Sequence, residues 1–231
     1  MGLTTSLSPA MSFPEPFPDH LATCLARPLP GPSAQYKMAS LRRLEELGLQ
    51  AAPPPNVKLA AVLLLLFFQE KNWHLTLIQR TVNPQDRHSG QISFPGGRYE
   101  PTDETLANAA LREAHEELGV RPERVQLLGR LTELYVPISN FVVHPFVGVL
   151  HDGQPPDFTP QPGEVATILV PPLALFLDKN TRKMTDINIS ETIVLKNVPY
   201  FEVEERVLWG ATAMILNELL EVLRAGLEKS T

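Results

Sequence analysis

The chain is poor in cysteine and in long apolar runs. Its 231 residues include one cysteine, Cys24, so no disulfide can form within the chain. No cysteine and histidine cluster has the spacing of a structural zinc site, and we therefore expect a reducing, cytoplasmic location. The longest apolar run, Leu59–Phe68, has ten residues, about half of what a membrane-spanning helix needs. It predicts a buried strand and no membrane partner.

Positive charge is also scarce, with 20 Lys and Arg against 26 Asp and Glu and a formal net charge of −6. A nucleic-acid partner is not expected, because such binding needs a basic face. A phosphorylated small molecule stays open, since a divalent cation can reverse the local charge. The composition, 43% hydrophobic and 20% charged, is that of a globular chain with a core. It leaves the oligomeric state, a homodimer included, open.

Prolines divide the chain, since ten of the 23 fall before Asn56. Residues 1–55 are predicted to form an N-terminal arm, and residues 56–231 the main domain. Within the arm, residues 1–34 are expected to be extended, either laid on the body or loose. Residues 35–48 are expected to form a short helix, because their leucines recur at helical spacing before Gly48.

The main domain shows a mixture of strand and helix patterns. Helices are expected over residues 103–118, with Thr102 or Asp103 as the cap, and over Val207–Leu227. Strands are expected over Lys58–Phe68, Trp73–Arg80, Val125–Glu133, Asn140–Leu150, Glu164–Val170 and Glu191–Val198, the last followed by a turn at Pro199–Phe201. Because strands and helices do not alternate regularly, the pattern predicts an α+β fold or an α/β/α sandwich.

Carboxylates cluster on the first of these helices. Glu113, Glu116 and Glu117 are spaced i, i+3, i+4 and so share one helix face, where their charges repel. One interpretation is a solvated face with Arg112 as local relief. The other is a site for Mg²⁺ or Mn²⁺, cations that prefer hard oxygen ligands and would neutralise the repulsion. The pair Gly96-Gly97 before the helix allows the backbone to approach such a cation closely.

The segment resembles the Nudix box, whose pattern is G-x5-E-x7-R-E-U-x-E-E-x-G-U, with U aliphatic. Arg112 to Val120 fits the second half, with Ala114 as a small U residue. The first half is one residue longer, which is similar to the coenzyme A branch of the family. Six residues after Gly97 stands Asp103, whereas the glutamate eight residues before Arg112 is Glu104. Which of the two fills the first acidic position stays open.

A second resemblance lies upstream of the box. Coenzyme A diphosphatases carry L-L-T-x-R-(S/A)-x3-R-x3-G-x3-F-P-G-G, and Gly90 to Gly97 fits its end. Arg80 and Arg87 stand where the pattern has arginines, although Thr81 replaces Ser or Ala and the arginine spacings differ by a few residues. The segment Leu208–Met214 also resembles the end of such proteins.

The resemblance implies a Nudix α/β/α sandwich with a mixed sheet. It also implies metal-dependent hydrolysis of the pyrophosphate of coenzyme A or acyl-CoA, giving 3′,5′-ADP and a 4′-phosphopantetheine product. One alternative is a Nudix diphosphatase acting on ADP-ribose, NADH or another nucleoside diphosphate derivative. Another is a Nudix binding module without catalysis, against which the intact box argues.

The resemblance further implies roles for individual residues. Glu113 and Glu117 would be the main Mg²⁺ or Mn²⁺ ligands, aided by the Gly97 carbonyl, and Glu116 would hold a second ion or act through water. Arg112 would orient a box glutamate.

Glu164, in a Pro-Gly loop, would be the general base or else a solvated loop residue. Arg80 and Arg87 would bind substrate phosphate or else be surface charges. Tyr135 would stack on adenine or line the pantetheine channel, as Phe141 would unless it packs in the core. His115 and His144 receive no role.

Overall fold

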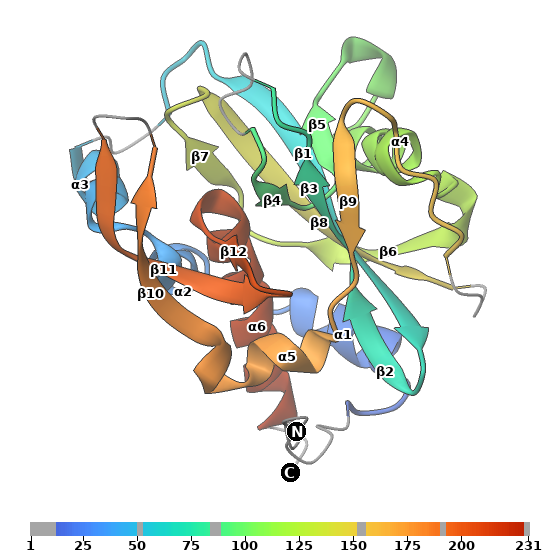
Figure 1. The fold of residues 1–231 in the computed structure, drawn as a ribbon. Coiled ribbons are helices and arrows are strands. Elements are labelled where there is room, and N and C mark those ends of the chain that lie inside the picture. Colours follow the sequence, from blue (N-terminus) through green and yellow to red (C-terminus); the bar gives the residue numbers. More distant parts are fainter. Residues whose placement is uncertain (1–12, 50–52, 84–88, 152–155, 190–192, 229–231) are drawn as a thin grey trace, which may run out of the picture.

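The computed structural model describes residues 13–49, 53–83, 89–151, 156–189 and 193–228. Its central element is a mixed sheet built around β1 (Lys58–Gln69), the apolar run of the sequence (Figure 1). The strand order is β2-β1-β8-β6, with β5 paired to β1 and β7 to β8; β1 and β8 run parallel and the other pairs antiparallel. The bounds are β2 (Asn72–Leu75), β5 (Gly96–Arg98), β6 (Val125–Arg130), β7 (Leu134–Val136) and β8 (Phe141–Leu150).

Helices cover both faces of this sheet. Ala61, Leu63 and Leu65 of β1 join one buried cluster with α4 (Leu106–Leu118), whereas Leu64 and Leu66 join another with α6 (Gly210–Leu227) and α1 (Phe17–Leu25). Successive side chains of a strand point to opposite faces, so a continuous apolar run is buried from both sides. The predicted α+β sandwich with a mixed sheet is confirmed.

Two smaller sheets lie beside the central one. The first contains β4 (Ile92–Ser93), β3 (Leu77–Arg80) and β9 (Val165–Leu169); the second contains β10 (Arg182–Asn188), β11 (Val194–Val203) and β12 (Arg206–Leu208). The single strand predicted over 73–80 is wrong, because β2 pairs with β1 whereas β3 pairs with β4 and β9. The turn predicted at 199–201 is also wrong, because β11 continues through it between β10 and β12. The short helix α5 (Leu173–Leu177) was not predicted.

The N-terminal segment differs most from expectation. Its described part is not extended but helical, with α1, α2 (Pro32–Gln35), a 3-10 turn at Tyr36–Met38 and α3 (Leu41–Leu49) in place of the single helix 35–48. Phe17 and Leu21 are fully buried in the cluster of α6. The prolines do not prevent these helices, because they stand at the helix starts, where proline is tolerated, and apolar residues follow at helical spacing. The division of the chain at residue 55 stays a prediction.

A buried carboxylate ties this segment to the core. Glu218 of α6 accepts hydrogen bonds from the Gly31 N–H at 3.1 Å, the Gln35 amide at 2.8 Å and the Thr132 hydroxyl at 2.7 Å. The Thr132 N–H also donates to Glu218, at 3.2 Å. A buried carboxylate with this many donors is stable without a counter-ion.

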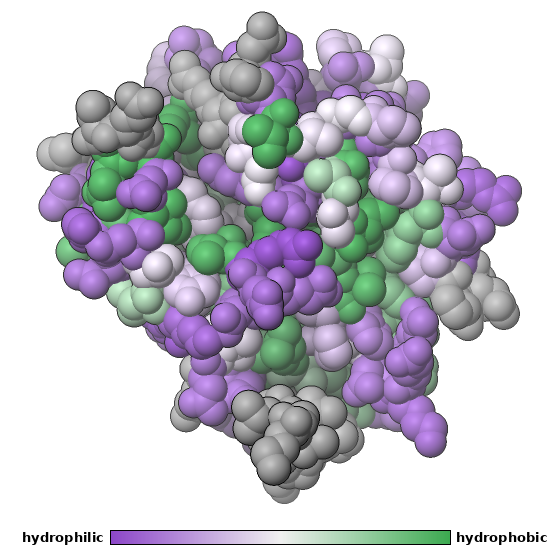
Figure 2. All heavy atoms as spheres, in the orientation of Figure 1, coloured by the Kyte–Doolittle hydropathy of each residue, from purple (hydrophilic) through white to green (hydrophobic). Residues whose placement is uncertain are grey.

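The surface drawn in Figure 2 is mostly hydrophilic, with hydrophobic atoms gathered over α3 and the upper parts of β10 and β11. Exposed large apolar residues of these elements are Leu41, Leu44, Met184 and Val194. Within the described ranges, no helix has both the length and the apolar character needed to cross a membrane.

Candidate active site

Two adjacent glycines bring β5 into contact with the carboxylates of α4. The Gly96 N–H donates a 2.8 Å hydrogen bond to Oε2 of Glu117. Gly96 has φ +151°, and a Cβ there would collide with the Ala61 carbonyl. A Cβ on Gly97 would lie 2.5 Å from the carboxyl carbon of Glu113. Only a residue without a side chain therefore leaves room for Glu113 against this strand.

The helix that carries these carboxylates begins later than predicted. Residues Pro101–Asp103 form a 3-10 turn. Glu104, with φ +59°, separates this turn from α4. Thr105 is the cap, since its hydroxyl accepts from the Asn108 N–H at 3.1 Å, and the caps predicted at Thr102 or Asp103 are wrong. The helix ends at Leu118, as predicted, and Gly119 follows in the left-handed conformation.

Arg112 is the centre of an ion-pair network that joins the two halves of the box. Its Nε donates to Oδ1 of Asp103 at 2.6 Å, and its Nη1 donates to Glu113 at 3.0 Å and Glu116 at 3.2 Å. Its Nη2 donates to the Arg98 carbonyl at 3.1 Å. Asp103, not Glu104, therefore occupies the first acidic position, and the hydrogen bond from Arg112 holds the pKa of the Asp103 carboxyl below its usual range.

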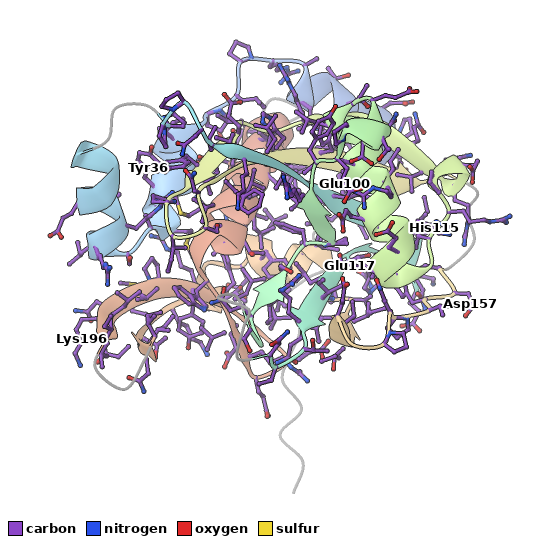
Figure 3. All side chains as sticks on the ribbon, turned by 90° about the horizontal axis from the view of Figure 1, so that it is seen from above. Tyr36, Glu100, His115, Glu117, Asp157 and Lys196 are labelled. Atoms are coloured by element: carbon purple, nitrogen blue, oxygen red, sulfur yellow. The ribbon has the colours of Figure 1, made fainter. Side chains whose placement is uncertain are left out.

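The three glutamates of the box are not equivalent. The side chains are exposed by 1% for Glu117, 14% for Glu113 and 48% for Glu116. Figure 3 shows Glu117 on the inner side of α4 and His115 on the outer side. The common face expected from i, i+3, i+4 spacing thus divides into two inward carboxylates and one at the edge.

Burial and mutual repulsion destabilise the charged forms of the inner carboxylates. Burial raises the pKa of Glu117 to about 8, with the charges of Glu113 and Glu164 adding to the rise. The Gly96 N–H and Arg80, whose Nη1 lies 3.8 Å from Glu117 Oε1, oppose it. Burial likewise raises the pKa of Glu113, which Arg112 opposes.

A divalent cation fits this donor set. Within the part of the chain that the structure describes, no three acidic, histidine or cysteine side chains form a ready-made metal cluster. The arrangement instead offers two inward carboxylates packed on a glycine backbone, with repulsion that a cation would remove.

Glu164, distant in sequence, lies next to this site. It precedes β9, whose Val165 pairs with Arg80 of β3, and its carbonyl accepts from the Thr81 N–H at 2.9 Å. Its charge raises the pKa of both Glu113 and Glu117, which places the three carboxylates within electrostatic reach of one another. The pairing of β3 with β9 is what brings Glu164 and Arg80 together.

Tyr135, Phe141 and His144 make none of the contacts described above with the box glutamates. Tyr135 of β7 is separated from β5 by β8 and β1, and its hydroxyl donates to Asn140 at 3.2 Å. Phe141 is half-buried under the Lys58 ammonium, 5.6 Å from its ring centre. Arg87 lies outside the described residues. His144 is half-buried on β8, and burial lowers its pKa.

Two contributors to the site were not predicted individually, namely the Gly96 N–H and the Arg98 carbonyl. Both are backbone groups, whose orientation depends on the pairing of β5 with β1. The Gly-Gly pair was the signal in the sequence that the backbone approaches the carboxylates here.

Two curated proteins are similar to this chain in sequence. The chain is 34% identical over 178 residues to an uncharacterized Nudix hydrolase NudL of Photorhabdus laumondii, covering 75% of this chain and 91% of that protein. It is 31% identical to Nudix hydrolase 22, chloroplastic, of Arabidopsis thaliana, covering 78% of this chain and 61% of the plant protein.

Among solved structures, RenU, a Nudix hydrolase of M. smegmatis, superimposes with a TM-score of 0.49 at 19% identity, covering 72% of this chain and 85% of that one. The model of the NUDIX domain matches residues 57–188, which contain β1, the box and β9. The chain belongs to the Nudix hydrolase family.

Proposed function

We propose that the protein hydrolyses the pyrophosphate bond of coenzyme A or acyl-CoA, with Mg²⁺ or Mn²⁺ as cofactor. One observation carries the proposal: the segment that resembles coenzyme A diphosphatases lies directly on the Nudix box. Its Arg80 side chain is 3.8 Å from Glu117, and its two final glycines touch Glu117 and Glu113. The same short segment therefore supplies both a cation for phosphate and the backbone of the carboxylate site.

In this proposal Glu113, Glu117 and the Gly97 carbonyl hold the divalent cation, and Glu116 serves a second ion or acts through water. When bound, the cation stabilises negative charge on the phosphate oxygens. Arg112 is a positioning residue, because its contacts with Asp103, Glu113 and Glu116 fix the box.

Glu164 is the proposed general base. It takes a proton from the attacking water, whose oxygen forms a bond to phosphorus while the bridging P–O bond breaks. The products are 3′,5′-ADP and a 4′-phosphopantetheine. Arg80 binds a substrate phosphate, and Arg87 and Tyr135 stay proposed substrate contacts. A cytoplasmic location and a homodimer also stay predictions.

The experiment is a hydrolysis panel with coenzyme A, acetyl-CoA, ADP-ribose and NADH, each with Mg²⁺, with Mn²⁺ and with EDTA. We expect the highest kcat/KM for one of the coenzyme A compounds and no turnover with EDTA. A higher kcat/KM for ADP-ribose or NADH would make that compound the substrate in place of coenzyme A. No turnover on any compound would favour a binding module.

Arg80 offers a finer test of how the substrate is held. Loss of one charged phosphate contact in Arg80→Ala should lower kcat/KM by about ten- to a hundredfold. Equal losses for coenzyme A and dephospho-coenzyme A place Arg80 at the pyrophosphate. A loss for coenzyme A alone places it at the 3′-phosphate, and no loss for either removes it from the site.

A further inference from the structure

A cavity of about 540 Å³ opens between the sheet of β3 and β4 and the sheet of β10–β12. This volume lies within the range of about 300–1,000 Å³ that is usual for small-molecule sites. Its walls come from Gln79 and Ile92 on one side and from Ile187, Arg206 and Trp209 on the other. The second of these sheets lies largely beyond the matched NUDIX domain, which ends at residue 188.

The cavity and the carboxylates lie on opposite faces of β3. Leu77 and Gln79 of this strand face the cluster of α6, whereas Ile78 and Arg80 face that of α4. Gln79 reaches Arg206 at 3.1 Å, while Arg80 reaches toward Glu117. A ligand that occupies both places must reach around β3, past Arg80 and past Thr81, whose N–H donates to the Glu164 carbonyl at 2.9 Å. Such a ligand must be long.

The lining of the cavity suits an uncharged group. Among the described residues that line the cavity, Arg206 alone is charged. It donates to the Gln79 side chain and the Glu204 carbonyl, and its Nη1 lies 3.5 Å from the Glu204 carboxylate. Its charge is therefore matched before any ligand binds. The other polar lining groups are amides and a hydroxyl, and Val207 and Trp209 add apolar surface. Amides beside apolar walls complement a chain that itself alternates amides and methylenes.

We propose that this cavity is the subsite for the neutral, amide-bearing pantetheine arm of the substrate, while its diphosphate lies at the box. The proposal rests on the proposed function for the identity of the arm. It assigns the β10–β12 sheet a role in substrate specificity, with Val207 and Asn188 as residues that contact the arm.

The test uses the full chain and two probes, pantetheine and 3′,5′-ADP, with binding measured by calorimetry. Val207→Trp fills the cavity from an exposed position on β12, and Met184→Trp places the same ring at an exposed position of β10 outside the lining. We expect Val207→Trp to weaken pantetheine binding by at least about tenfold and Met184→Trp to change it less than about twofold. Binding of 3′,5′-ADP should stay within about twofold in both variants.

Asn188→Ala, at an exposed position, is the second variant should Val207→Trp not fold. It should weaken pantetheine binding by about threefold through loss of one hydrogen-bonding side chain. Undetectable binding of pantetheine to the wild type, or equal losses for both probes, would overturn the proposal.

Failure of the proposed function gives a different result. Wild-type enzyme would then leave coenzyme A intact, whatever pantetheine does in calorimetry. If the wild type does hydrolyse coenzyme A, Val207→Trp should raise KM by about tenfold with kcat nearly unchanged.

Discussion

Two buried glutamates, Glu117 of α4 and Glu218 of α6, face the core from opposite sides with very different partners. Glu218 receives hydrogen bonds from two backbone N–H groups, one amide and one hydroxyl. Among the hydrogen bonds of the described residues, Glu117 receives one, from Gly96, and has two like charges nearby. A fully paired buried carboxylate is a structural tie, whereas one with a single hydrogen bond beside other carboxylates indicates a missing ligand.

The largest expected effect is a loss of activity on substitution of Glu117, which substitution of Glu218 should not cause. Glu117→Gln should lower kcat by about 10³-fold or more, because a neutral amide is a poor ligand for a hard cation. Its free energy of unfolding should not fall, since the amide replaces a buried carboxyl group whose charged form is poorly paired. Steady-state kinetics at saturating Mg²⁺ and urea denaturation measure the two quantities. Near wild-type turnover would show that Glu117 is not a cation ligand.

The second effect is a loss of stability on substitution of Glu218, which substitution of Glu117 should not cause. Glu218→Ala leaves the N–H groups of Gly31 and Thr132 buried and unpaired, which should lower the free energy of unfolding by roughly 2–5 kcal/mol. Urea denaturation is the measurement, and the folded variant should keep kcat within about twofold. A loss under about 0.5 kcal/mol would mean that water replaces the carboxylate and that the tie to the N-terminal segment is weak.

Patterns along the chain predicted most strands of the central sheet and the helix that carries the three glutamates. The apolar run that became β1 is a local signal with one strong structural interpretation, whereas the spacing of the glutamates was also compatible with a solvated helix face. The observed cap, Thr105, lies two or three residues after the predicted ones, a difference that is usual for helix ends.

What could not be predicted depends on contacts between distant residues. β10 is largely polar and exposed and lacks alternating apolar residues. Its pairing with β11 therefore could not be predicted from its own sequence. The helices α1 and α2 were obscured by prolines, and their burial depends on α6, nearly 200 residues later. The choice between Asp103 and Glu104 likewise required the Arg112 side chain to be placed.

The third effect tests whether Glu164 belongs with Glu117. As general base, Glu164→Gln should lower kcat by about a hundredfold while Mg²⁺ affinity stays within a few-fold. Kinetics over a range of Mg²⁺ concentrations separates the two quantities. A parallel loss of Mg²⁺ affinity would make Glu164 a cation ligand. A kcat within about threefold of wild type would make it a solvated loop residue.

The smallest effect is a pH dependence to which Glu117 should contribute strongly, with Glu113, whose pKa is also raised, adding to it. The pKa of Glu117 is raised to about 8 in the folded chain, so between its ordinary value and pH 8 the folded state retains a proton that the unfolded state has released. Without Mg²⁺, stability should therefore fall as the pH rises through this window, by at most about 1.4 kcal/mol per pH unit for each retained proton.

Bound Mg²⁺ replaces that proton, so the gain in Tm on adding Mg²⁺ should grow from pH 6 to about pH 8 and then level off. Thermal unfolding with Mg²⁺ and with EDTA at each pH gives this difference. Glu117→Gln should reduce it, leaving the contribution of Glu113, whereas Glu218→Gln, the matched control at the paired site, should lower Tm at every pH and keep the slope. The same slope in both variants would assign the proton to another group and remove the distinction between the two glutamates.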